Sequence, residues 1–150
     1  IDPLSNDRAE DAERRFGALF ERCLLQRAKA VFAHVCGRLR SMGMFELAEK
    51  TAKKFVKDFP HDHESWFEIV ATRFQQKRFP IVKETMTNAM RVLKACDYVS
   101  LQIRLARMEI EGGQAGRAVS ILKQLLGEKP QARGRVEALL REAGLEDHIA

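Results

Sequence analysis

Apolar residues recur at intervals of three and four along almost the whole chain, and polar or charged residues fill the positions between them. This spacing is the period of an amphipathic α-helix. The sequence shows no sustained alternation of apolar and polar residues and no Asn-Gly or Asp-Gly turn, so nothing in it favours a β-hairpin. The pattern predicts an all-α protein of about seven or eight helices.

The predicted helix boundaries follow the Gly and Pro residues that interrupt this pattern. Gly43, Gly113 and Gly144 follow apolar stretches, while Pro60 and Pro130 stop the helices before them. The expected helices are 7–25, 27–42, 44–59, 62–77, 80–95, 97–111, 114–127 and 132–143. The first is expected to bury an apolar stripe made of Ala12, Phe16, Leu19, Phe20 and Cys23.

Two segments of the chain repeat one another at an offset of 70 residues. The matching positions are Gly43 with Gly113, Ala48 with Ala118, Phe55 with Leu125, and Pro60 with Pro130. Because 70 is twice 35, a middle copy is expected, and the helix predicted at 80–95 supplies it without the small Ala. A period near 35 residues indicates stacked helical hairpins, each of which buries its apolar faces against its neighbours.

The chain is therefore interpreted as one helical-repeat domain, a right-handed α-solenoid of antiparallel hairpins. Its expected parts are an unpaired helix at 7–25, hairpins at 27–60, 62–95 and 97–130, and a C-terminal capping helix at 131–144. Residues 12–20 match the second helix of a hairpin, yet no first helix precedes them, and the chain begins with Ile1. These features predict a segment of a longer solenoid.

Composition and charge favour an ordinary solvated helical surface over a nucleic-acid-binding one. Hydrophobic residues make up 45% and charged residues 31%, and the net charge of +5 is distributed with both signs interspersed. No stretch approaches the ~20 apolar residues of a membrane span, so no membrane partner is expected. Cys23, Cys36 and Cys96 show no paired spacing and are predicted to be small core residues in a reducing compartment.

One tight cluster of metal-type ligands, His61-Asp62-His63, follows Pro60. A surface metal site is one interpretation, but two His side chains at this spacing provide too few fixed ligands. Capping of the next helix by Asp62 is the favoured alternative. Since no Gly-rich phosphate loop, nucleophile signature or paired acidic motif is present, we expect no catalytic residue, metal site or cofactor, and a protein that is not an enzyme.

A basic helix face is the candidate contact surface. Four lysines recur at helical spacing and carry charges suited to phosphates or acidic proteins, and two arginines are expected to enlarge the patch: Lys50, Lys53, Lys54, Lys57, Arg38 and Arg40. The alternative is that these lysines form the water-facing side of their helix. Trp66 is interpreted as a core residue, with a role as a partner-binding anchor as its alternative.

Parts of the sequence resemble HAT (half-a-TPR) repeats, relatives of tetratricopeptide repeats. The run Phe16-Gly17-Ala18-Leu19-Phe20-Glu21-Arg22-Cys23-Leu24 is similar to the second helix of a HAT repeat, and Trp66 lies where the first helix carries its Trp. Followed by Met44-Phe45-Glu46-Leu47-Ala48-Glu49 and Ser65-Trp66-Phe67, the order of these pieces over residues 12–130 resembles the C-terminal HAT region of large ribosomal-RNA-processing proteins that carry many OB-fold domains.

This resemblance implies a non-catalytic scaffold for protein–protein interaction in ribosome biogenesis and pre-ribosomal RNA processing, in the nucleus and nucleolus. The implied partners are other protein subunits of a ribonucleoprotein-processing assembly, with RNA contact and a homodimer as open alternatives. Two other functions stay open: a general tetratricopeptide-type adaptor that binds a peptide or tail of a partner, and a HAT factor of messenger-RNA processing or a solenoid that binds RNA directly.

Overall fold

The computed structural model describes residues 3–148, with side chains described from residue 8 onward, and every regular element in this range is a helix. The elements are α1 (Pro3–Ser41), α2 (Phe45–Asp58), α3 (His63–Gln75), α4 (Phe79–Val92), α5 (Ala95–Glu111), α6 (Ala115–Glu128), α7 (Arg133–Glu142), and 3₁₀ turns at Pro130–Ala132 and Glu146–His148. Within residues 3–148, no helix has both the length and the apolar character needed to cross a bilayer.

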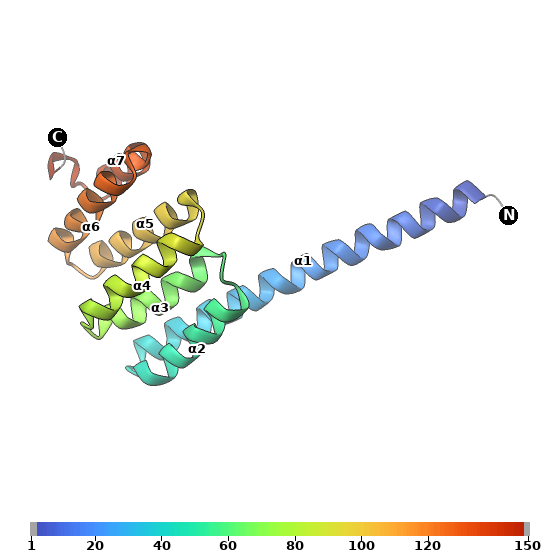
Figure 1. Ribbon diagram of the computed structural model, residues 1–150, viewed down its shortest axis with the longest axis horizontal. Helices are drawn as coiled ribbons and strands as arrows, with labels where there is room; N and C mark the ends of the chain where they lie inside the picture. Colours follow the sequence, from blue (N-terminus) through green and yellow to red (C-terminus); the bar gives the residue numbers. More distant parts are fainter. Residues whose placement is uncertain (1–2, 149–150) are drawn as a thin grey trace.

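The helices stack as a solenoid, which confirms the predicted architecture. Neighbouring helices in the sequence pack against one another, and the odd-numbered helices α1, α3, α5 and α7 also contact one another in series. The even-numbered helices α2, α4 and α6 each follow an odd-numbered partner as the second helix of a hairpin (Figure 1). The turns between them span only a few residues, which brings consecutive helices back antiparallel.

The prediction of separate helices at 7–25 and 27–42 is wrong, because α1 runs without interruption through 39 residues. Only the last third of α1 packs against α2 and α3, and the rest projects from the stack as a single rod (Figure 1). The junction around Gln26 contains neither Gly nor Pro and is made of good helix formers, so nothing there ends the helix. Residues 7–25 therefore do not fold back as a separate helix.

The core follows the repeat found in the sequence. Ala48, Ala52 and Phe55 of α2 are fully buried, as are the equivalent Ala118, Leu122 and Leu125 of α6. At the α1–α2 contact, the ring of Phe32 stacks on that of Phe55 with centroids 4.9 Å apart. Ala48 and Ala118 are small enough to let α2 and α6 approach their neighbouring helices closely. Phe55 and Leu125, two turns further along each helix, are therefore fully covered.

The cysteine prediction holds for one residue of three. Cys36 is fully buried, whereas Cys23 and Cys96 are exposed. Cys23 lies on the part of α1 that no other helix covers, and Cys96 lies in the first turn of α5, which begins two residues before the predicted start at residue 97. Burial raises the pKa of the Cys36 thiol to about 12, with a further contribution from nearby Glu68. The thiol is therefore protonated at neutral pH.

The first helix of each hairpin, α1, α3 or α5, ends in the same turn geometry. Gly43 and Gly113 have φ angles of 74° and 77°, and Lys77 takes the corresponding place with a φ of 59°. In each case the next residue donates its backbone N–H back into the last turn: Met44 to Leu39, Arg78 to Arg73, and Gln114 to Glu109, at N···O distances of 2.9, 3.1 and 2.7 Å. This left-handed cap identifies Lys77 as the marker of the middle repeat, which the sequence comparison placed only by its apolar residues.

We expect the substitution Lys77→Gly to stabilise the protein by about 1 kcal/mol, because a side chain in the left-handed region is strained and glycine is not. The matched control is Lys123→Gly, at an exposed site inside α6, which should destabilise it by about 1 kcal/mol. Urea denaturation followed by circular dichroism measures both changes. A loss of stability in Lys77→Gly would contradict the turn geometry.

Candidate protein-binding surface

An apolar stripe lies uncovered on the projecting part of α1, and we call it the α1 stripe and define it as Phe16, Leu19, Phe20 and Leu24. Phe16 is 71% exposed, and the other three side chains are between 49% and 56% exposed. They recur at helical spacing, so they share one side of α1. Within residues 8–27, no second helix of this chain lies over that side.

The repeat shows that this exposure is unusual for these positions. Leu19 aligns with Phe55 of α2 and Leu125 of α6, at offsets of 36 and 106 residues. Leu19 is 55% exposed, whereas both equivalents are 0% exposed because odd-numbered helices pack over them. The prediction that the first helix buries Ala12, Phe16, Leu19, Phe20 and Cys23 is thus wrong for the chain on its own, because all five are exposed. The same residue pattern is a core where a neighbour exists and a surface where none does.

The four lysines of the predicted basic face lie exposed on α2: Lys50, Lys53, Lys54 and Lys57. None of them has a carboxylate within 4 Å among the side chains described from residue 8 to residue 148. They lie opposite the buried residues Ala48, Ala52 and Phe55. This face is therefore free to meet an anionic partner, and it is equally what a water-facing helix side looks like.

The two arginines proposed to enlarge that face behave differently. Arg38 is exposed near the end of α1. Arg40 instead points into the stack, where its guanidinium pairs with Glu68 of α3, which is 3% exposed. Burial outweighs this pairing and raises the pKa of Glu68. Arg40 also lies 5.9 Å from the ring of Phe67, so its charge serves the α1–α3 contact within the chain.

Trp66 lies in the core, as its favoured interpretation predicted. Its side chain is 9% exposed, and its indole N–H donates to the carbonyl oxygen of Pro60 at 2.7 Å. Ser65 Oγ lies 2.6 Å from the carbonyl oxygen of Phe59. These hydrogen bonds fix the turn between α2 and α3, so the surface that Trp66 offers to a partner is small.

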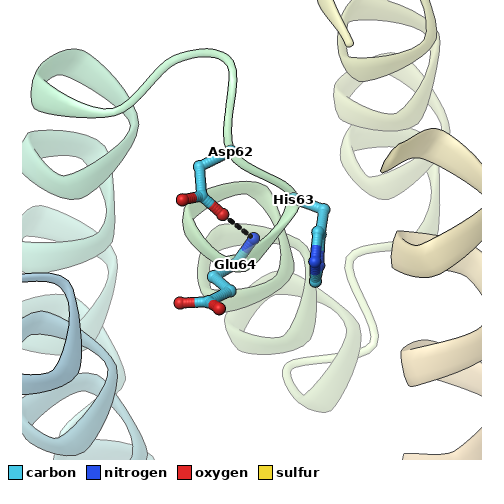
Figure 2. A group of neighbouring side chains, drawn as sticks. All are labelled: Asp62, His63 and Glu64. Atoms are coloured by element: carbon cyan, nitrogen blue, oxygen red, sulfur yellow. Dashed lines mark hydrogen bonds between the residues drawn. The ribbon is translucent and has the colours of Figure 1, made fainter. Parts of the chain in front are cut away.

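The cluster after Pro60 caps a helix, as expected. Asp62 Oδ1 accepts a hydrogen bond from the backbone N–H of Glu64 at 3.0 Å (Figure 2), and Asp62 Oδ2 pairs with Lys29 Nζ of α1 at 2.7 Å. Asp62, His63 and Glu64 each bring a potential ligand atom within 4.8 Å of the others, while His61 is not part of the group. Because both oxygens of Asp62 already have donors, this arrangement is that of an N-cap with an interhelical ion pair.

An apolar hollow of about 410 Å³ lies between α4 and the α5–α6 hairpin. Its walls include Phe79, Met86 and Met90 of α4 and Ile121 of α6. At its floor, Tyr98 Oη donates to Glu128 at 2.9 Å, and burial raises the pKa of this phenol to about 12. The degenerate middle repeat explains the hollow, because α4 lacks the small residue that brings α2 and α6 close to their neighbours.

Two of these surfaces were not found from the sequence. The α1 stripe was assigned to the core because its pattern matches that of α2, and the only signal against this was the lack of a helix breaker near Gln26. The hollow beside α4 was signalled by the missing Ala of the middle repeat, but its size depends on helix positions that the pattern does not give.

Comparison with known proteins identifies no family for this chain. No protein-family model matches the chain, and no curated protein sequence matches it. A solved structure described as the crystal structure of MamA is similar to it, with a TM-score of 0.44 and 15% sequence identity over 99% of this chain and 88% of that one.

Equivalent positions of the repeat are expected to respond differently to truncation. Leu125→Ala should lower the free energy of unfolding by about 2–5 kcal/mol, since it opens a cavity in a filled core. Leu19→Ala should change it by less than about 0.5 kcal/mol, because the side chain is exposed. Urea denaturation of the two variants tests this, and equal losses would mean that the α1 stripe is covered in solution.

Asp62 is expected to make stability depend on pH. Burial alone would raise its pKa, but the hydrogen bonds from Lys29 and from the Glu64 N–H hold it below its ordinary value of 3.8. The folded protein thus binds this proton less readily than the unfolded chain, so the stabilisation is complete above about pH 4 and is lost as pH falls through the folded-state pKa. The free energy of unfolding should therefore fall more steeply below about pH 4 in the wild type than in Asp62→Asn.

Glu49 serves as an internal control for this pH series, because it is present in both the wild type and Asp62→Asn. Glu49, whose pKa is also lowered by hydrogen bonds from Arg73 and Arg78 against the opposing effect of burial, contributes equally to both proteins. Parallel pH curves for the wild type and Asp62→Asn would show that Asp62 has no special role.

Proposed function

We propose that this chain is a non-catalytic protein-interaction scaffold that binds its partner through the α1 stripe. The observation that carries the proposal is the exposure of Phe16, Leu19 and Phe20 at positions where the other repeats bury their core. Exposed apolar side chains that line up on one helix, bordered by charged residues, are typical of protein-binding surfaces.

The energetics favour occupation of this stripe. Full burial of a Leu or Phe side chain contributes about 1.5–3 kcal/mol, so covering three of them contributes up to about 9 kcal/mol. This gain is comparable to the cost of association, so a specific complex also needs apolar residues of the partner to be buried at the same contact. The projecting helix presents them on a preformed, regular scaffold, which limits the entropy lost on binding. The buried, protonated thiol of Cys36 is unsuited to nucleophilic chemistry, which agrees with a binding role.

The proposal extends to the assembly in which the scaffold works. The resemblance of residues 12–130 to HAT regions of ribosomal-RNA-processing proteins supports a place among the protein subunits that mature pre-ribosomal RNA, in the nucleolus. A general adaptor for a partner's peptide or tail is the alternative. Direct RNA contact is a second candidate function, supported by the four exposed lysines of α2, from Lys50 to Lys57.

The test is a pull-down from nuclear extract with the wild-type chain and with a triple variant of the α1 stripe, Phe16→Gln, Leu19→Gln and Phe20→Gln. Glutamine keeps the helix and removes the apolar surface. We expect the wild type to retain pre-ribosomal proteins after nuclease treatment and the triple variant to lose them. The matched control, Arg14→Gln, Ala18→Gln and Glu21→Gln on the opposite side of α1, should bind like the wild type.

Other outcomes assign the alternatives. Loss of the retained proteins on nuclease treatment, together with loss of RNA in a variant with all four lysines of α2 changed to Glu, would indicate RNA binding. Retention of chaperones in place of pre-ribosomal factors would indicate the general adaptor. Equal retention by the wild type and the triple Gln variant would contradict the role of the α1 stripe.

A further inference from the structure

A row of basic side chains borders the α1 stripe along one side. Arg8, Arg15 and Arg22 are exposed and follow one another at intervals of seven residues, and Lys29 continues the row. Residues seven apart in an α-helix lie on nearly the same side, and Arg15 is a helical neighbour of Leu19 four positions on. A partner that covers the α1 stripe therefore also meets this row, which we call the basic row.

The structure shows what meets the basic row where α1 is covered. Lys29, its last member, lies under the start of α3 and pairs with Asp62 at 2.7 Å, and both side chains are mostly buried. This hydrogen bond raises the pKa of Lys29. Further along, Arg40 of α1 pairs with Glu68 of the same helix α3. The helix that packs on α1 within the chain thus supplies a carboxylate at both places.

A second copy of the chain is a poor occupant of the α1 stripe. If two α1 helices packed antiparallel through their apolar stripes, equivalent flanks of the two helices would lie next to each other. The basic row of one copy would then lie against the basic row of the other. A parallel pair would set Arg22 against Arg27 but Arg8 against Glu13, so charge gives it no net support. Charge therefore opposes the antiparallel pair and does not favour the parallel one, which makes a different chain the better-fitting partner.

We infer that the α1 stripe binds an amphipathic α-helix of a partner protein whose apolar face is flanked by Asp or Glu residues. The apolar face covers Phe16, Leu19 and Phe20, and the acidic flank pairs with the basic row as Asp62 does with Lys29. Arg15 exchanges its present contact with Asp11, a 3.0 Å pair in open water, for the partner's carboxylate. This inference rests on the proposed protein-binding function of the same surface and adds the chemistry of the partner.

The experiment uses two synthetic helical peptides of about three heptads with Leu at a and d positions, one with Glu and one with Lys at e and g positions. Binding of each labelled peptide to the chain is measured by fluorescence anisotropy. We expect the Glu peptide to bind about tenfold more tightly than the Lys peptide, since three exposed charge pairs each contribute modestly. Added salt should reduce this difference.

Charge reversal of the basic row, with Arg8→Glu, Arg15→Glu and Arg22→Glu, should make the Lys peptide the tighter ligand. The control Lys50→Glu, Lys53→Glu and Lys54→Glu changes the net charge by the same amount on α2 and should keep the wild-type preference. The triple Gln variant of the α1 stripe should bind neither peptide. Circular dichroism checks that each variant keeps its helices.

The outcomes separate this inference from the proposed function. Equal binding of both peptides to the wild type, lost in the triple Gln variant, would overturn the acidic flank and leave the α1 stripe as a binding surface. Failure of both peptides to bind a chain that light scattering shows to be a dimer would assign the stripe to a second copy. Failure to bind a monomeric chain, or binding that survives in the triple Gln variant, would overturn both.

Discussion

The helices of this solenoid have apolar sides that water disfavours, and the stack depends on packing another helix against each of them, with the projecting part of α1 as the exception. The series of contacts among α1, α3, α5 and α7 is the continuous element that does this, and α2 and α6 dock their buried residues against it. Helices of 10 to 17 residues such as α5 and α7 are marginal in isolation, so each owes its stability to the next one in the stack.

Ion pairs between the helices fix their relative positions, which apolar packing alone leaves less defined. Lys29 and Asp62 join α1 to α3, and Glu49 of α2 receives hydrogen bonds from both Arg73 and Arg78, at 2.9 and 3.0 Å. These side chains are half-buried or more deeply buried, where an unpaired charge is costly. A helix that slid along its neighbour by one turn would break such pairs, so they help to fix how the hairpins stack.

The sequence predicted what depends on local pattern and missed what depends on neighbours. The limits of α2 and α6, the buried Ala48 and Ala118, and the cap by Asp62 all follow from residues close to one another in the chain. The exposure of Leu19 does not, since its local pattern equals that of Phe55 and only the presence of a covering helix differs. The inward turn of Arg40 toward Glu68 likewise depends on where α3 comes to lie.

The uninterrupted length of α1 also sets how far the projecting helix reaches from the stack. At a rise of 1.5 Å per residue, its 39 residues span about 58 Å, and most of that length projects beyond the hairpins (Figure 1). A protein held at the far half would stand clear of the stack and leave the lysine side of α2 accessible to a different molecule at the same time. With a molecule bound at each place, the rod would act as a spacer that keeps the two close enough to raise their local concentration without a clash.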